Sequence, residues 1–151
     1  AGRRDEVLVV RADSTRPPLP RSAFRSVLLD APCSGTGTLR KNPEIRWRLA
    51  PADLAPLAAA QRSLLAAALD LCAPGGSVVY VTCSLEPEEN EEVVAAVVGA
   101  RGDAAVAPPD ASALPPPLRA ALRPDGFLRV PPGASNDGFS AVVFRKVGES
   151  R

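Results

Sequence analysis

Two hydrophobic patterns alternate along the first half of the chain. Short apolar runs bounded by turn residues occur at 7–10, 26–30 and 77–82, and such runs are typical of strands buried on both faces of a parallel sheet. Residues 51–73 instead carry apolar side chains at steps of three and four. That spacing predicts one long amphipathic helix, with Asp53 as its N-cap and Pro74-Gly75-Gly76 after its end.

The second half predicts another helix and a small antiparallel ending. Glutamates come first and valines afterwards between residues 86 and 98, which suits a helix that begins near Pro87. Residues 101–117 are interpreted as a loop with a weak strand at 104–107. Strands are expected at 126–130 and 139–146, and the turn signal Asn136-Asp137-Gly138 between them predicts an antiparallel hairpin. The whole pattern is that of an α/β fold with an antiparallel final strand.

Composition narrows the class of protein. A chain of 151 residues, 46% of them hydrophobic, can form one domain with a buried core. No window approaches the roughly 18 consecutive apolar residues of a membrane helix, and no signal-type apolar segment follows the charged start, so we expect a cytoplasmic protein with no membrane contact. The net charge of +1 excludes an extended basic footprint, so any contact with nucleic acid must be local.

Acidic side chains follow two of the apolar runs. Asp13 comes shortly after the first run and Asp30 ends the second. Ligands of open α/β sheets bind outside the carboxyl ends of the strands, so an acid at either position is placed to meet a substrate. The alternative for both residues is turn or helix capping, for which Asp is a favoured residue.

Cysteines follow two of the predicted strands. Cys33 and Cys83 each come just after a strand and could share a pocket at one sheet edge, whereas Cys72 lies on the apolar stripe of the long helix and is expected in the core. The odd number of cysteines, three, argues for free thiols in a reducing compartment. Since the chain contains no histidine, a Cys–His hydrolase is excluded and a metal site is not expected. The pair is then either a nucleophile with a second thiol or a redox disulfide.

One tryptophan stands among basic residues. Trp47, the only tryptophan, is surrounded by Arg40, Lys41, Arg46 and Arg48. Basic side chains interleaved with an aromatic can contact phosphates and stack on a base. An equally good interpretation is a solvated loop in which Trp47 fills the core.

The cysteine segments resemble a known family. Asp30-Ala31-Pro32-Cys33-Ser34-Gly35-Thr36-Gly37, the segment 40–47, and Tyr80-Val81-Thr82-Cys83-Ser84 with 86–90 resemble the Sun-domain (Nol/Nop/Sun) RNA (cytosine-5)-methyltransferases, most closely the bacterial type that acts on ribosomal RNA. Asp137-Gly138-Phe139 is similar to the family's closing motif, with Ser140 in place of its last Phe.

The resemblance implies a substrate, a cofactor and site residues. It implies methyl transfer from S-adenosylmethionine to carbon 5 of a cytosine in RNA, expected to be ribosomal. The thiolate of Cys83 would add to carbon 6 of the base, and Cys33 would assist removal of the proton on carbon 5 and release of the RNA. Asp30 would hold the base beside the methyl donor, and Asp13 matches the acid that reads the cofactor's adenine. The base must be unstacked to enter such a pocket.

The family's cofactor loop and N-terminal RNA-binding region have no counterpart in residues 1–151. The chain also contains no Met. We therefore expect it to be the carboxyl-terminal portion of one methyltransferase domain, with an incomplete Rossmann-like class I sheet. Two alternatives stay open: a non-RNA methyltransferase on the same fold, which would not need Cys83, and an inactive fragment or interaction module.

Overall fold

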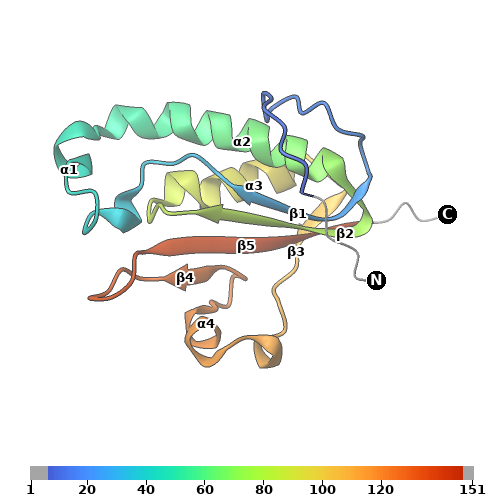
Figure 1. The fold of residues 1–151 in the computed structure, drawn as a ribbon. Coiled ribbons are helices and arrows are strands. Elements are labelled where there is room, and N and C mark those ends of the chain that lie inside the picture. The colour runs from blue at the N-terminus through green and yellow to red at the C-terminus, as the bar shows by residue number, and fades with distance from the viewer. Residues whose placement is uncertain (1–6, 148–151) are drawn as a thin grey trace.

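The strands form one five-stranded sheet in the computed structural model, which describes residues 7–147 (Figure 1). Strands β1 and β2 are parallel, whereas β5 runs antiparallel to β2 and pairs with both short strands on its other side. The order is β1-β2-β5-β3, with β4 also on β5. The strands span Phe24–Asp30 (β1), Cys72–Thr82 (β2), Ala104–Val106 (β3), Leu128–Val130 (β4) and Phe139–Lys146 (β5).

Two helices pack against the sheet and enclose the core. Helix α2 (Leu54–Leu71) connects the parallel strands, and α3 (Glu91–Gly99) follows β2. Fully buried side chains of both helices meet alternate residues of β2 and β5, because one face of a strand carries every second side chain. This cluster includes Leu65, Leu69, Val93, Val78, Tyr80, Val142 and Phe144.

Much of the predicted fold is confirmed. The chain is mixed α/β, the long helix and the strands after it lie where the patterns place them, and the last strand is antiparallel. Cys72 is fully buried in the core. The long helix ends earlier than predicted, since β2 already begins at Cys72. Gly75, with φ 73°, lies in an irregular part of β2, where the register with β1 shifts.

The first predicted strand is wrong. Residues 7–10 form no strand, and Val7, Leu8 and Val9 are more than four-fifths exposed. A strand needs a neighbour to satisfy its backbone donors and acceptors. β1 is an edge strand of the described sheet, and no described strand pairs with this run.

Two short helices were interpreted as loop. Helix α1 (Ile45–Arg48) lies in the basic segment, and α4 (Pro116–Ala121) begins at the end of the Ala- and Pro-rich stretch. Asp53 stands at the N-cap position of α2 as predicted, but its side chain makes no capping bond to that helix. Its Oδ2 instead accepts the backbone N–H of Ala50 at 2.8 Å and closes the preceding 3-10 turn, Pro51–Asp53. Helices of four to six residues leave too weak a periodicity to recognise.

The sequence contains no apolar window long enough for a membrane helix, and the helices of the structure can be checked for the same property. Within residues 7–147, no helix combines the length and apolar character needed to cross a bilayer. The charged start at residues 1–4 lies outside the described residues.

Candidate active site

The parallel register of β1 and β2 brings Cys33 and Cys83 together. Asp30 at the end of β1 pairs with Val81 near the end of β2, and the N–H of Ala31 donates to the carbonyl of Val81 at 2.9 Å. Both cysteines therefore leave the sheet at the same edge. Their Sγ atoms lie 3.3 Å apart, within hydrogen-bond distance. The two thiols that the sequence places at one sheet edge are thus neighbours.

A glycine loop closes over the turn that carries Cys83. The N–H of Gly37 donates to the carbonyl of Cys83 at 2.8 Å, and the N–H of Gly138 donates to the carbonyl of Gly37 at 2.8 Å. A Cβ at position 37 would lie 2.4 Å from the Gly138 carbonyl oxygen and 2.8 Å from that of Cys83. Only glycine allows this approach, so the Gly-Thr-Gly segment is a packing element for the cysteine turn.

A buried carboxylate lies beneath the two cysteine segments. Glu89 is fully buried, and its Oε1 accepts the backbone N–H of Ser34 at 2.9 Å and the side-chain amide of Gln61 at 2.8 Å. The Ser34 hydroxyl donates to Oε2 of Glu89 and lies 3.2 Å from the Ser84 hydroxyl. A buried carboxylate with several donors fixes the groups around it. Glu89 thereby ties the segment after Cys33 to the segment after Cys83.

Gln61 and Asn90 complete this polar support. The amide of Gln61 also donates to the carbonyl of Pro32 at 2.9 Å, one residue before Cys33. Asn90 accepts from the Thr82 hydroxyl at 2.8 Å and donates to the carbonyls of Ser84 and Glu86 at 3.2 and 2.7 Å. The residues on both sides of Cys83 are therefore held by one side chain.

The environment of Cys33 favours its neutral thiol. Burial, followed by the hydrogen bond to Cys83 and that residue's charge, raises the pKa of the Cys33 thiol to about 12. A thiol with this pKa remains protonated near neutral pH. Cys33 is thus the natural hydrogen-bond donor of the pair, and the Cys83 sulfur is the natural acceptor.

The two predicted acids lie in different environments. Asp30 is exposed at the carboxyl end of β1, three residues before Cys33, and no hydrogen bond holds its carboxylate in the described part of the chain, so it is not a cap. Asp13 is exposed, and its Oδ1 accepts from the N–H and hydroxyl of Thr15 at 2.9 and 2.7 Å, which lowers its pKa.

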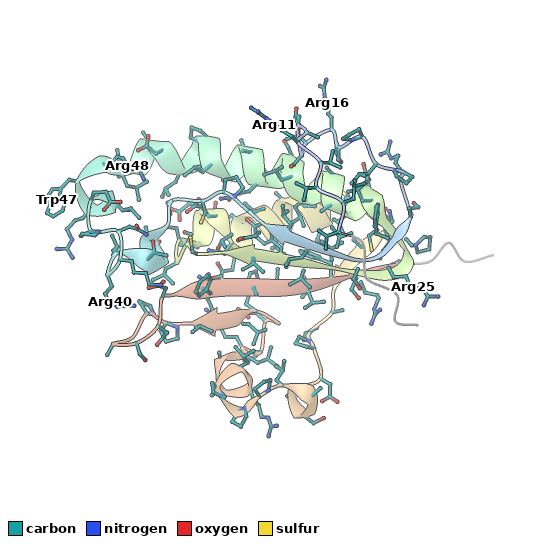
Figure 2. All side chains as sticks on the ribbon, viewed as in Figure 1. Arg11, Arg16, Arg25, Arg40, Trp47 and Arg48 are labelled. Carbon is teal, nitrogen blue, oxygen red and sulfur yellow. The ribbon has the colours of Figure 1, made fainter. Side chains whose placement is uncertain are left out.

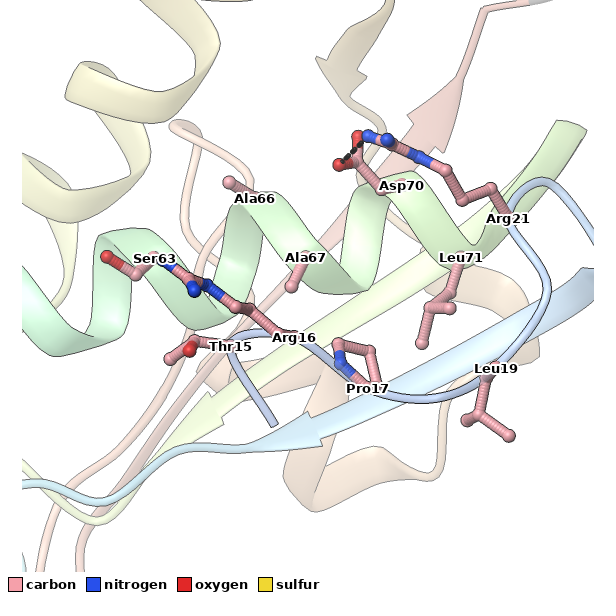
Figure 3. Close-up of a pocket in the computed structure, with 10 residues that line it drawn as sticks. All are labelled: Thr15, Arg16, Pro17, Leu19, Arg21, Ser63, Ala66, Ala67, Asp70 and Leu71. Carbon is pink, nitrogen blue, oxygen red and sulfur yellow. Dashed lines mark hydrogen bonds and ion pairs between the residues drawn. The ribbon is translucent and has the colours of Figure 1, made fainter. Parts of the chain in front are cut away.

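Asp13 does not join the cysteines. Among residues 7–147, no hydrogen bond links Asp13 to Asp30, Cys33 or Cys83. Thr15 and Arg16, which follow Asp13, line a separate pocket against Ser63, Ala66 and Ala67 of α2 (Figure 3). That position is beside the middle of the helix and not beyond the ends of the strands.

Asp30 and Asp13 are the two acids that the family resemblance assigns to cofactor binding. Asp30 has a free carboxylate at the expected edge of the sheet, which fits a group that accepts hydrogen bonds from a ligand. Asp13 has one oxygen, Oδ1, engaged by Thr15, and its other oxygen makes no hydrogen bond to a described residue. In the described residues, no three side chains of metal-binding type gather into a candidate metal centre.

Trp47 points into solvent. Its side chain is 78% exposed on α1, which rules out the core-filling interpretation. Arg40 and Lys41 contact the nearly buried carboxylate of Asp137 at 3.4 and 2.5 Å, so their charge is partly neutralised. Arg48 lines a groove of about 520 Å³ together with Cys33.

Sequence reasoning missed three site residues. Glu89, Asn90 and Asp137 stand in segments that carry the family resemblance, but the sequence assigned none of them a contact in the site. The signals were weak, because a charged residue is usually exposed and nothing local marks the exception. The available indication was their place in the segment 86–90, which follows the cysteine motif whose Thr82 donates to Asn90.

Comparison with known proteins places the chain in a family. Residues 3–145 match the family described as 16S rRNA methyltransferase RsmB/F. Ribosomal RNA small subunit methyltransferase F of Serratia proteamaculans is 40% identical over 129 residues, which is 85% of this chain and 27% of that protein. Ribosomal RNA small subunit methyltransferase B of Thermus thermophilus is 42% identical over 135 residues, 89% of this chain and 32% of that protein. The chain thus spans between a quarter and a third of these relatives.

Solved structures agree in fold. A methyltransferase homolog protein from Pyrococcus horikoshii superposes with a TM-score of 0.61 at 32% identity, covering 83% of this chain and 40% of that one. NSun6 from the same organism, solved with SFG, superposes with a TM-score of 0.74 at 24% identity, covering 96% and 36%, and this likeness shows the fold alone. The match over residues 3–145 shows that the chain belongs to the RsmB/F family of 16S rRNA methyltransferases, a family of Sun-domain proteins.

Proposed function

We propose that this chain supplies the nucleophile of an RNA (cytosine-5)-methyltransferase that uses S-adenosylmethionine and acts on ribosomal RNA. The observation that carries the proposal is the pair of thiols 3.3 Å apart at the carboxyl edge of two parallel strands. Relatives named as ribosomal RNA small subunit methyltransferases support the class of substrate. Membership of a methyltransferase family supports S-adenosylmethionine as the methyl donor, as the resemblance implies.

Cys83 is the proposed nucleophile. Carbon 5 of cytosine is too weak a nucleophile to accept a methyl group unaided. When the Cys83 thiolate bonds to carbon 6, the electron pair of the 5,6 double bond moves toward carbon 5, which becomes nucleophilic. S-adenosylmethionine, when bound, supplies an electrophilic methyl group at this point. Loss of the proton on carbon 5 then restores the double bond, and the electrons of the sulfur–carbon bond return to Cys83.

Cys33 is the proposed proton carrier. As a thiol it donates a hydrogen bond to the Cys83 sulfur and so stabilises the thiolate before attack. Part of the rise in the pKa of Cys33 comes from Cys83, and this part is lost once the Cys83 sulfur is bonded to carbon. Cys33 is then easier to ionise, which is what a base for the carbon 5 proton requires.

Asp30 is the proposed contact to the base. Its exposed carboxylate is three residues from Cys33 and is free to accept a hydrogen bond from the cytosine amino group or from the methyl donor. The role of Asp13 at the cofactor adenine stays a prediction from the resemblance. Because both catalytic thiols must stay reduced, we expect the protein to act in the reducing cytoplasm.

Methylation of isolated 16S rRNA by the full-length protein tests the proposal. With radiolabelled S-adenosylmethionine, nucleoside analysis should find the label in 5-methylcytosine. Cys83→Ala should abolish labelling, while Cys72→Ala, which alters a buried cysteine outside the site, should retain it. Label in any other nucleoside, or undiminished labelling by Cys83→Ala, would reject the reaction proposed here. Label in small molecules or protein alone would favour a non-RNA methyltransferase.

A further inference from the structure

A groove beside Cys33 leads away from the reacting atoms. It has a volume of about 520 Å³, and its lining includes Cys33, Ser34 and Arg48 together with Leu49 and Leu57. Residues of the candidate site and of the basic segment therefore line the same groove. A target nucleotide at Cys33 would have its chain neighbours at this opening.

Trp47 and two arginines form the outer end of this surface. Trp47 is 78% exposed, and Arg46 and Arg48 flank it on α1. Figure 2 shows Trp47 and Arg48 projecting from the end of the molecule that holds α1. Neither Arg46 nor Arg48 forms an ion pair with a described residue, whereas Arg40 and Lys41 contact Asp137. The two arginines are the cations of this segment that remain free for a ligand.

The chemistry of this surface fits an unpaired nucleic acid strand. An exposed indole offers a flat face on which any base can stack, and guanidinium groups on either side can contact phosphates. Asp53 also lines the groove, and its Oδ2 accepts the Ala50 N–H. Its negative charge would repel phosphates, so the strand is expected at the Arg48 end of the groove.

We propose that Trp47, Arg46 and Arg48 bind the single-stranded RNA next to the target nucleotide, with a neighbouring base stacked on Trp47 and its phosphates on the arginines. Because stacking accepts every base, this surface selects for an unpaired strand and not for a sequence. The placement next to the target rests on the proposed function, but the binding of an unpaired strand does not.

Fluorescence of Trp47 tests the proposal directly. Residues 1–151 contain one tryptophan, so quenching that is present in the wild type and absent in Trp47→Leu reports on this position. Titration with an oligouridine of about ten nucleotides, which contains no cytosine, should quench the emission saturably through stacking. The same oligouridine paired with oligoadenosine should quench much less. Equal quenching by the duplex, or no quenching by the single strand, would overturn the proposal.

Variants separate stacking from charge. Because Trp47→Leu removes the fluorescent side chain, the anisotropy of a dye-labelled oligouridine measures the affinity of each variant. Trp47→Leu should weaken binding about 10-fold, within the range of one lost base stack, with an unchanged slope of log K against log salt. Arg46→Gln and Arg48→Gln should each reduce that slope by about 0.7, the amount for one phosphate contact on a single strand. Arg25→Gln, which removes the same charge at the far end of β1, should change neither quantity. Wild-type affinity in Trp47→Leu, or an equal effect of Arg25→Gln, would contradict the assignment.

The result of the quenching titration does not depend on the result of the methylation experiment. Cys83→Ala should lose methyl transfer and keep the quenching by oligouridine. Loss of quenching in an enzyme that still methylates through Cys83 would reject this surface and leave the proposed function standing. If RNA causes no quenching and Trp47→Leu instead abolishes self-association of the chain, the surface is a protein contact and the proposal fails.

Discussion

At the scale of single residues, Cys33 and Cys83 have identical side chains but different proposed roles. Cys33 stays a protonated thiol near neutral pH because burial and Cys83 raise its pKa to about 12. The meeting of Cys33 and Cys83 could be predicted from sequence, since each follows a run of β-forming residues and parallel strands end at one edge. The burial of Glu89 could not, because it depends on Ser34, which is 55 residues away in sequence.

The protonation of Cys33 predicts the order of thiol alkylation. At pH 8, iodoacetamide should modify Cys83 first, because Cys33 is still a thiol and Cys72 is fully buried. As the pH rises toward 12, the modification of Cys33 should accelerate. Peptide mass spectrometry over time measures both. Faster alkylation of Cys33 than of Cys83 at pH 8 would contradict the assigned roles.

Glu89 is expected to position the cysteine segments. Glu89→Gln places an amide donor against groups that already donate, so buried donors lose their acceptor and stability should fall by about 1–3 kcal/mol. Oxidation by diamide to a Cys33–Cys83 disulfide should also slow, because the two segments are no longer held together. Glu92→Gln, an exposed change on α3, is the matched control. Urea unfolding and free-thiol titration give the two readouts, and wild-type values in Glu89→Gln would remove it from this role.

At the scale of elements, two loops distant in sequence close on the turn after β2. Gly37 bonds to Cys83 on one side and Gly138 on the other, so the ends of β1, β2 and β5 meet at one point. The sequence predicts the strands and turns because their signals are local. It does not predict this contact, nor the short helices α1 and α4, because the contact is set by tertiary packing and four to six residues carry little periodicity.

Gly37→Ala tests this closure. The added Cβ would meet two carbonyl oxygens at less than 3 Å, so the loop must shift, and stability should fall by about 1–3 kcal/mol. Gly102→Ala is the control, since a Cβ there meets nothing within 4 Å, and it should be neutral or slightly stabilising. Denaturant unfolding compares the two variants. Equal stabilities would show that the loop is not tightly closed.

At the scale of the whole molecule, the central strands and the edge strand of the sheet differ in how well their backbone amides are protected from exchange. β2 and β5 pair on both sides, while β1 pairs on one side and Leu28 is 70% exposed. The apolar run at 7–10 suggested a buried strand, but apolar residues stay exposed where no strand pairs with them. In the 151-residue chain taken alone, native-state hydrogen exchange should therefore show backbone amides of β2 and β5 that are protected for longer than those of β1. Longest protection in β1 would contradict this description of the sheet.

The covalent bond between Cys83 and the target base is the central claim of the account. Cys33→Ala in the full-length protein removes the proposed base for the carbon 5 proton, so with S-adenosylmethionine and 16S rRNA the adduct should persist through denaturation. After nuclease and protease digestion, mass spectrometry should find a methylated cytosine nucleotide on the peptide that contains Cys83, and no adduct in the double variant Cys33→Ala/Cys83→Ala. A nucleotide on any other residue, or an adduct that survives in the double variant, would contradict the account.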